Sequence, residues 1–345
     1  MRADGAFPYH APEMLRARFV AGLERQLRDE GGLGPFILVL NNALMDQDIA
    51  TALGDAPRRR FGALSAAYQE RRAAGRDADE PADDLAVFEA LLALGFGAVA
   101  PVRERAVGPW RLQYNQVRAL RPARSAAESP RGNRAPFDPA RFHFDKPFLR
   151  KETFWSGAVG GVALDLLYNK FPFAPYHGLL VPERGAHRPQ WLGPGDHRLA
   201  WRLAEGAAVD GFGIGYNAYG AFASINHLHF QTFADPRPLP VEQGRWRHNG
   251  GGEPYPAACE VFTDANAAWR RLDALQAAGT SFNLLYRPGR LYCLSRRRQG
   301  DLPLPEWCGG LAWLELCGAF VVSDPGRLEG MAAAELEGVL WESRP

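Results

Sequence analysis

One segment past the middle of the chain constrains the fold most, because polar and apolar side chains alternate along residues 225–233. In an extended strand, residues two positions apart project from the same face. We therefore expect a strand here, with His227, His229 and Gln231 in one polar row and apolar side chains behind them.

The segments that precede this strand predict an α+β fold. Residues 162–168, 178–181 and 211–216 are strand-like, and residues 196–207 carry apolar side chains on one helical face. Asp196 is expected to cap that helix. The order strand, strand, helix, strand, strand is typical of an antiparallel sheet with helices packed on it.

Other elements are predicted from apolar periodicity and turn residues. They are helices over residues 11–29, 49–74 (split near Gly54 and Pro57), 265–278 and at the end of the chain, a strand over 110–115 and a hairpin turn at 287–290. Residues 123–136 lack periodicity and are expected to form a mobile loop or flap. A Pro-rich stretch at 236–240 predicts a boundary between two lobes, residues 1–238 and 239–345.

The polar row suits phosphorus chemistry. A histidine is partly neutral near pH 7, since its ordinary pKa is about 6.5, so the imidazole of His229 can be a nucleophile. Gln231 can donate a hydrogen bond to a phosphate oxygen without carrying charge. An isolated His-x-His is more often structural or a pair of metal ligands. Here the glycine-rich run of residues 211–224, which lets backbone approach a ligand closely, favours the functional interpretation.

Composition excludes several classes of protein. A net charge of +1 over 345 residues provides no field for nucleic acid polymers or anionic membranes. The four cysteines form no Cys-x-x-Cys pair, so no structural zinc is expected. The phosphorus chemistry requires no metal, and the motif region contains no Asp/Glu cluster with ligand spacing, so no other metal or cofactor is expected. No apolar run reaches about 18 residues and the N-terminus lacks an apolar signal core, which predicts a cytoplasmic protein without a membrane span. A homodimer stays open.

The run of residues 215–233 resembles the active-site segment of the GDP-hexose phosphorylases, the GDP-L-galactose and GDP-D-glucose phosphorylases of the histidine-triad superfamily. Weaker similarity at residues 112–118, 137–146, 177–182 and 282–285 extends the resemblance over roughly residues 110–325. Val117 stands where that family usually has glycine, and no glycine precedes His177. The nucleophile segment itself keeps the family's pattern.

The resemblance implies a histidine-triad-like antiparallel sheet with packed helices and a smaller C-terminal α/β lobe. Residues 1–238 would be the GDP-hexose phosphorylase-like catalytic region and 239–345 the C-terminal lobe of the same enzyme. His229 would attack the α-phosphorus of a GDP-sugar, releasing hexose 1-phosphate, and inorganic phosphate would discharge the guanylyl-histidine as GDP. His227 would orient the nucleophile, bond a phosphate oxygen, or hydrogen-bond to backbone.

Two further sets of residues follow from the resemblance. Gln231 would favour transfer, because hydrolases of the superfamily tend to have a third histidine there, whereas transferases and phosphorylases tend to have glutamine. For Lys170, an exposed lysine on a loop is nearly as good an interpretation as a ligand contact. The candidate substrate contacts are Ser224, Asn226, Gly220, Asn217, His177, Asn169, Lys170, Asn115 and Arg118.

Three alternatives remain open from the sequence. A diadenosine polyphosphate phosphorylase or a hexose-1-phosphate nucleotidyltransferase would use the same histidine and glutamine row with another base or acceptor. A nucleotide-binding regulator that has lost turnover belongs to a different class, and the intact His229 and Gln231 speak against it.

Overall fold

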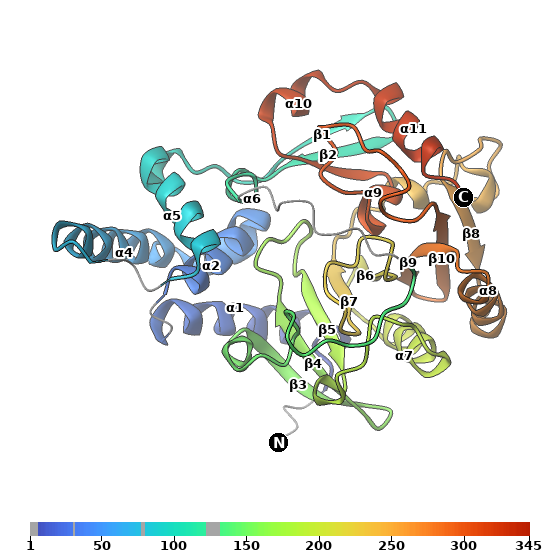
Figure 1. Ribbon diagram of the computed structural model, residues 1–345, viewed down its shortest axis with the longest axis horizontal. Coiled ribbons are helices and arrows are strands. Elements are labelled where there is room, and N and C mark those ends of the chain that lie inside the picture. Colours follow the sequence, from blue (N-terminus) through green and yellow to red (C-terminus); the bar gives the residue numbers. More distant parts are fainter. Residues whose placement is uncertain (1–5, 30–31, 77–79, 122–131) are drawn as a thin grey trace.

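A computed structural model of the chain describes residues 6–29, 32–76, 80–121 and 132–345 (Figure 1). Its centre is an eight-stranded sheet in the order β3-β4-β5-β7-β6-β9-β10-β8, in which every neighbouring pair is antiparallel. The strands are β3 (Thr153–Val159), β4 (Val162–Tyr168), β5 (Gly178–Pro182), β6 (Phe212–Asn217), β7 (Phe230–Ala234), β8 (Ala258–Phe262), β9 (Ser281–Arg287) and β10 (Arg290–Arg296). The predicted α+β class is confirmed.

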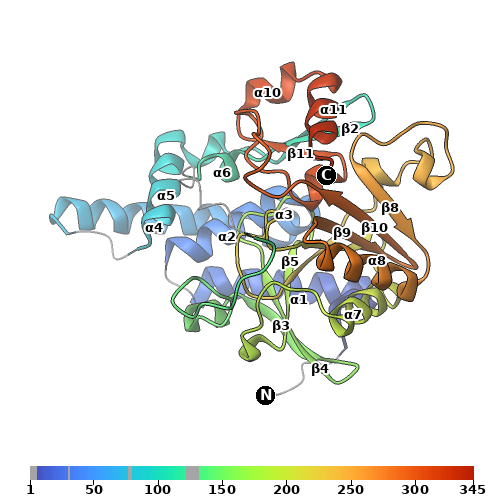
Figure 2. The ribbon, with the colours of Figure 1, turned by 45° about the vertical axis from the view of Figure 1, so that its right-hand side comes forward.

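Helices cover one face of this sheet. Alternate strand residues such as Leu166, Leu180, Ile214 and Phe230 point into one core cluster. The same cluster takes side chains from α1 (Pro12–Asp29), α7 (Pro194–Glu205) and α8 (Ala265–Ala277). Helices α7 and α8 pack side by side over the strands, as Figure 2 shows.

Further N-terminal helices precede the sheet in the chain, and α4 (Ala56–Ala73) and α5 (Ala82–Leu94) among them extend away from it at the left of Figure 1. The others are α2 (Leu33–Met45) and α3 (Gln47–Leu53). The predicted split of residues 49–74 is confirmed: Gly54 adopts a left-handed φ of 52° and Pro57 lies at the start of α4. Within the described residues, no helix combines the length and the apolar character needed to cross a membrane.

A second, smaller layer is formed by a three-stranded sheet. Its strands are β1 (Arg103–Val107), β2 (Trp110–Tyr114) and β11 (Ala319–Val322), of which β11 runs parallel to β2. Helices α9 (Trp313–Leu316), α10 (Pro325–Gly330) and α11 (Ala333–Glu342) belong to the same layer, and the short α6 (Gln116–Ala119) follows β2.

The predicted lobe boundary at residue 238 does not coincide with a break in either sheet. Strands β8, β9 and β10 follow it but continue the large sheet, and β1 and β2 precede it but pair in the layer that contains β11. The division into 1–238 and 239–345 stays a prediction. The predicted flap falls largely on residues 122–131, which lie outside the described residues.

One local prediction was wrong in detail. Asp196 is not the N-cap of α7, because Pro194 already begins the helix and Gly193 occupies the capping position. Asp196 lies in the first turn, where its Oδ2 accepts the Gly193 N–H at 3.1 Å. A carboxylate is stabilising at either place near a helix N-terminus, so the sequence could not separate the two.

Candidate active site

The predicted strand over residues 225–233 is shorter than expected. Strand β7 begins at Phe230, so His227 and His229 lie in the irregular segment just before it. The reason is that this backbone bonds to a loop instead of a strand: Leu228 N–H donates to the Arg188 carbonyl at 2.8 Å, and His229 N–H to Gln190 Oε1 at 2.9 Å. Both imidazoles still lie against one ring, with centroids 5.8 Å (His227) and 4.9 Å (His229) from Phe144.

The imidazole of His229 is held in one tautomer. Its Nδ1 lies 2.8 Å from the backbone oxygen of His227. A carbonyl oxygen can only accept, so Nδ1 carries the proton and Nε2 presents a lone pair. Burial lowers the pKa of His229 to about 4, although its hydrogen bond with the His227 backbone opposes the shift. The ring is therefore neutral near pH 7, in the form a nucleophile requires.

His227 takes the opposite tautomer. Its Nδ1 accepts the backbone N–H of Phe144 at 3.1 Å, so the proton lies on Nε2. The ring is fully buried, and burial, followed by the charges of His229, His143 and His187, lowers its pKa to about 4. The backbone hydrogen bond foreseen for this side chain is therefore present. It is the carbonyl of His227, not its ring, that contacts the imidazole of His229.

Gln231 is oriented by a tryptophan from the smaller layer. Its Oε1 accepts the indole Nε1–H of Trp313 at 2.9 Å, which leaves the carboxamide NH2 group as a donor. Trp313 packs closely over the sheet, because a Cβ on Gly215 would lie 2.3 Å from its indole. Glycine at position 215 thus permits the contact that orients Gln231.

His177 and Asn169 lie together beside Gln231. The two side chains meet at 3.2 Å between His177 Nε2 and Asn169 Nδ2. Burial first, and then the positive charge of Arg118, lower the pKa of His177 to about 3, against a hydrogen bond with Gln231 that raises it. Lys170 instead forms an ion pair with Asp84 of α5. The imidazole of His177 is neutral and cannot supply a positive charge to a phosphate.

Asn115 and Arg118 are connected to the region of His177 and Trp313 by the ring of Phe173. Asn115 Oδ1 accepts the Arg118 N–H at 3.0 Å at the start of α6. Arg118 donates to the Phe171 carbonyl at 2.6 Å and lies 5.7 Å from the centre of the Phe173 ring. The Phe173 ring is 4.2 Å from that of His177 and 5.7 Å from that of Trp313.

The candidate contacts near the motif have mostly structural partners. Asn217 Oδ1 accepts from Asn283 at 2.7 Å and from the Trp313 N–H at 2.9 Å. Asn226 Oδ1 accepts the Gln190 N–H at 3.0 Å. Gly220 has a φ of 90°, and its carbonyl accepts the Gln299 N–H at 2.7 Å, whereas Ser224 is exposed.

A second group of imidazoles adjoins His227. The rings of His143 and His187 lie 6.1 and 6.0 Å from that of His227, and Phe137 contacts all three. His187 Nε2 is 2.9 Å from Asp145 Oδ2. Within the ranges that the structure describes, no group of three or more His, Cys, Asp or Glu side chains is arranged to hold a metal ion.

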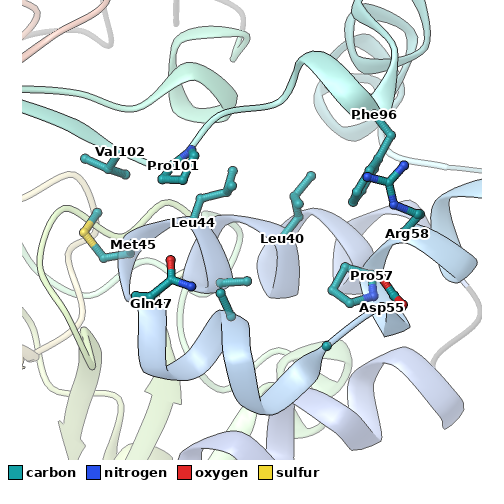
Figure 3. A pocket seen from close by; sticks show the side chains of 13 residues that line it. Leu40, Leu44, Met45, Gln47, Asp55, Pro57, Arg58, Phe96, Pro101 and Val102 are labelled. Carbon is teal, nitrogen blue, oxygen red and sulfur yellow. The ribbon is translucent and has the colours of Figure 1, made fainter.

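One hollow of about 420 Å³ lies elsewhere, among the N-terminal helices (Figure 3). Apolar side chains such as Leu40, Leu44 and Phe96 line it, with Gln47, Asp55 and Arg58 at its polar positions. None of its lining residues belongs to the histidine segment or to its partners. This hollow is therefore separate from the candidate active site.

Several residues of the site were not predicted. Gln190, Phe144, Phe173 and Trp313 come from irregular segments or a short helix, far from the motif in sequence. Phe144 lies in the family-like segment 137–146, although no role was predicted for it. Gln190, Phe173 and Trp313 carry no local signal, because each acquires its place only when the sheet brings distant segments together.

The fold places the chain in a class of known structures. It is similar to that of yeast Ap4A phosphorylase, with a TM-score of 0.51 and 17% identity over 77% of this chain and 96% of that one. At this identity the likeness establishes the fold alone.

The sequence comparisons are more specific. Residues 110–233 match the family described as GDPGP1-like, N-terminal domain. GDP-D-glucose phosphorylase 1 of Homo sapiens is 34% identical over 117 residues, which cover 32% of this chain and 30% of that protein. GDP-L-galactose phosphorylase 1 of Arabidopsis thaliana is 42% identical over 78 residues, 22% of this chain and 17% of that protein. The predicted resemblance to the GDP-hexose phosphorylases is confirmed, and the match spans less than a third of the length of these relatives.

The buried imidazoles predict a pH dependence of stability. The pKa is lowered to about 3 for His177 and to about 4 for His227 and His229, whereas an unfolded histidine titrates near about 6.5. Between these values the unfolded chain binds more protons, so the free energy of unfolding should fall as the pH drops from neutral towards about 4. Urea denaturation over this range measures the fall. The prediction would be contradicted if the free energy of unfolding stayed constant over this range and NMR titrations showed the ring of His229 becoming charged near about pH 6.5.

Proposed function

We propose that the protein is a GDP-hexose phosphorylase that transfers a guanylyl group from a GDP-sugar to inorganic phosphate through a guanylyl-histidine. The observation that carries this proposal is the tautomer of His229, whose Nδ1–H is bonded to the His227 carbonyl at 2.8 Å so that Nε2 carries the lone pair. The family match over residues 110–233 supports guanine nucleotide-sugars as substrates.

In the first step, Nε2 of His229 attacks the α-phosphorus and the bond from that phosphorus to the bridging oxygen breaks. Hexose 1-phosphate leaves with the oxygen, and the guanylyl group stays on the ring. Forming the N–P bond places positive charge on the imidazole, and the Nδ1–H bond to the His227 carbonyl stabilises that charge. Because the ring is neutral above its pKa of about 4, the nucleophile needs no base near neutral pH.

In the second step, inorganic phosphate attacks the same phosphorus and His229 leaves, which yields GDP. A phosphate oxygen is already anionic, so no side chain has to remove a proton from the acceptor, as one would for water. Gln231, whose Oε1 is occupied by Trp313, offers its NH2 group to a phosphate oxygen. This neutral donor suits transfer better than hydrolysis.

The other site residues are proposed in supporting roles. Arg118 is proposed to contact a phosphate or the ribose with Asn115, His177 and Asn169 nearby, and Ser224 to contact a phosphate from the exposed end of the loop. Asn226, Asn217 and the backbone around Gly220 are likewise proposed as substrate contacts. Lys170, which pairs with Asp84, is proposed as a ribose or phosphate contact. A cytoplasmic location, a catalytic region over residues 1–238, a C-terminal lobe over 239–345 and a homodimer belong to the same proposal.

Product analysis tests the proposal directly. The protein is incubated with GDP-glucose, GDP-mannose, GDP-L-galactose or diadenosine tetraphosphate, each with and without inorganic phosphate. We expect GDP and hexose 1-phosphate from at least one GDP-sugar, formed only with phosphate. GMP released at equal rates in both buffers would identify a hydrolase instead. If only diadenosine tetraphosphate reacts, and gives ADP and ATP when phosphate is present, the protein would instead be a diadenosine polyphosphate phosphorylase.

A further inference from the structure

Gln190 lies outside the histidine segment, yet its side chain makes two hydrogen bonds to His229 of that segment and a third to Asn217 at the end of β6. It is 1% exposed and belongs to the irregular stretch between β5 and α7. Its Oε1 accepts the His229 N–H at 2.9 Å, and its Nε2 donates to the carbonyls of His229 at 3.1 Å and Asn217 at 2.8 Å. One carboxamide therefore satisfies both backbone groups of His229.

The carboxamide takes the place of a strand contact. The ladder between β6 and β7 ends with Gly215 opposite Gln231. In an antiparallel register, the next equivalent pair would be Asn217 and His229. Instead, the Gln190 carboxamide lies between these two backbones and bonds to both. The strands separate here without leaving buried backbone groups unpaired, which would cost about 1–3 kcal/mol each.

The segment that carries Gln190 is itself anchored at both sides. Its backbone N–H donates to Asn226 Oδ1 at 3.0 Å, and the neighbouring Arg188 carbonyl accepts the Leu228 N–H at 2.8 Å. The Arg188 guanidinium bonds to both carboxylate oxygens of Asp196, at 2.8 and 3.1 Å, in the first turn of α7. The orientation of the His229 backbone is thus tied to a helix of the core.

We propose that Gln190 is a positioning residue for His229, a role that rests on the proposed function of His229 as the nucleophile. Fixing the N–H and the carbonyl of residue 229 fixes the direction of its side chain, and with it the bond from Nδ1 to the His227 carbonyl. No other residue type of this size offers one acceptor and two donors from a neutral group. Methionine would leave one N–H and two carbonyls without this partner, and a glutamate carboxylate would face both carbonyls.

Kinetics of two variants and one control test this role. Gln190→Met should lower kcat about 10²-fold, as a misplaced reacting group does, while KM for the GDP-sugar should change less than about threefold, because the Gln190 side chain is 1% exposed and bonds to backbone groups. Gln243→Met is the matched control, since it removes a glutamine that donates to a backbone carbonyl, that of Pro109 at 3.1 Å, away from the site. Its kcat should equal that of the wild type.

Gln190→Glu adds a readout that a merely structural role would not move. The buried carboxyl should have a raised pKa, and only its protonated form can donate to a carbonyl while still accepting the His229 N–H. Activity of this variant relative to the wild type should therefore rise as the pH is lowered. If the ratio of Gln190→Glu activity to wild-type activity does not change with pH, the proposal is overturned. This measurement replaces the first one in case Gln190→Met does not fold.

An NMR measurement without substrate separates this proposal from the proposed function. The ¹⁵N shifts of the His229 ring in the wild type should show one neutral tautomer, with the proton on Nδ1, and Gln190→Met should show a mixture. If the wild type turns over no GDP-sugar, only the proposed function fails, and the tautomer comparison still applies. An unchanged tautomer in Gln190→Met, or a raised KM with unchanged kcat, would show that Gln190 does not position His229.

Discussion

Replacing His229 with alanine or asparagine is expected to abolish phosphorolysis, with a loss in kcat of roughly 10⁴- to 10⁶-fold, the range seen when a covalent nucleophile is removed. Neither a methyl group nor a carboxamide can form the phosphoramidate. Asparagine keeps a side-chain N–H near the His227 carbonyl, so it preserves part of the local bonding that His229 makes at 2.8 Å. Steady-state assays with the preferred GDP-sugar measure the loss.

A matched control separates loss of chemistry from loss of the fold. His248→Asn removes another imidazole that bonds a backbone carbonyl, with Nε2 2.8 Å from the Val241 oxygen, in a part of the chain away from the site. His248→Asn should keep wild-type turnover. The circular dichroism spectrum and the urea midpoint of His229→Asn should be close to those of His248→Asn. Phosphorolysis by His229→Ala within tenfold of the wild type would remove His229 from the nucleophile's role.

The central strands β4, β5, β6 and β7 could be predicted from the sequence because they carry their own local signals, whereas β3 and β8 were not predicted. The alternation in β7 and the apolar runs in β4 and β5 reflect burial on each face, and burial fixes which residues such strands can contain. The same alternation misled at residues 225–229. There the backbone bonds to Arg188 and Gln190 instead of to a strand, and a pattern of side chains carries no information about the partner of a backbone N–H.

The site was predictable only where the motif itself supplies the chemistry. Gln231 could be recognised, but its orientation depends on Trp313, and that contact depends in turn on Gly215. Lys170 illustrates the opposite case: its position in the sequence beside Asn169 is compatible with a phosphate contact, and its ion pair with Asp84 of α5 follows only from the packing of the N-terminal helices. A local sequence pattern does not predict side-chain contacts with distant segments of the chain.

The covalent intermediate should be directly observable, because the two-step route predicts a stable enzyme form when the acceptor is withheld. Without phosphate, a GDP-sugar labelled in the guanylyl group should place about one label per chain on His229, as expected for a covalent intermediate. A phosphoramidate is cleaved by acid and resists base, so the label should be lost in acid and kept in base. His229→Asn should take up no label.

The fate and the stereochemistry of the label complete the argument. Adding phosphate should release the label from the protein as GDP faster than water releases it as GMP. Phosphate is already anionic, and the Gln231 NH2 group offers it a neutral donor. The hydrogen bond from Trp313 Nε1 to Gln231 Oε1, at 2.9 Å, orients that group. Each in-line displacement inverts the α-phosphorus, so two displacements must retain its configuration. A chiral phosphorothioate substrate reports this outcome. Inversion would mean that phosphate attacks the GDP-sugar directly, and His229, neutral because of its low pKa of about 4, would then act as a base or an orienting group rather than as the nucleophile.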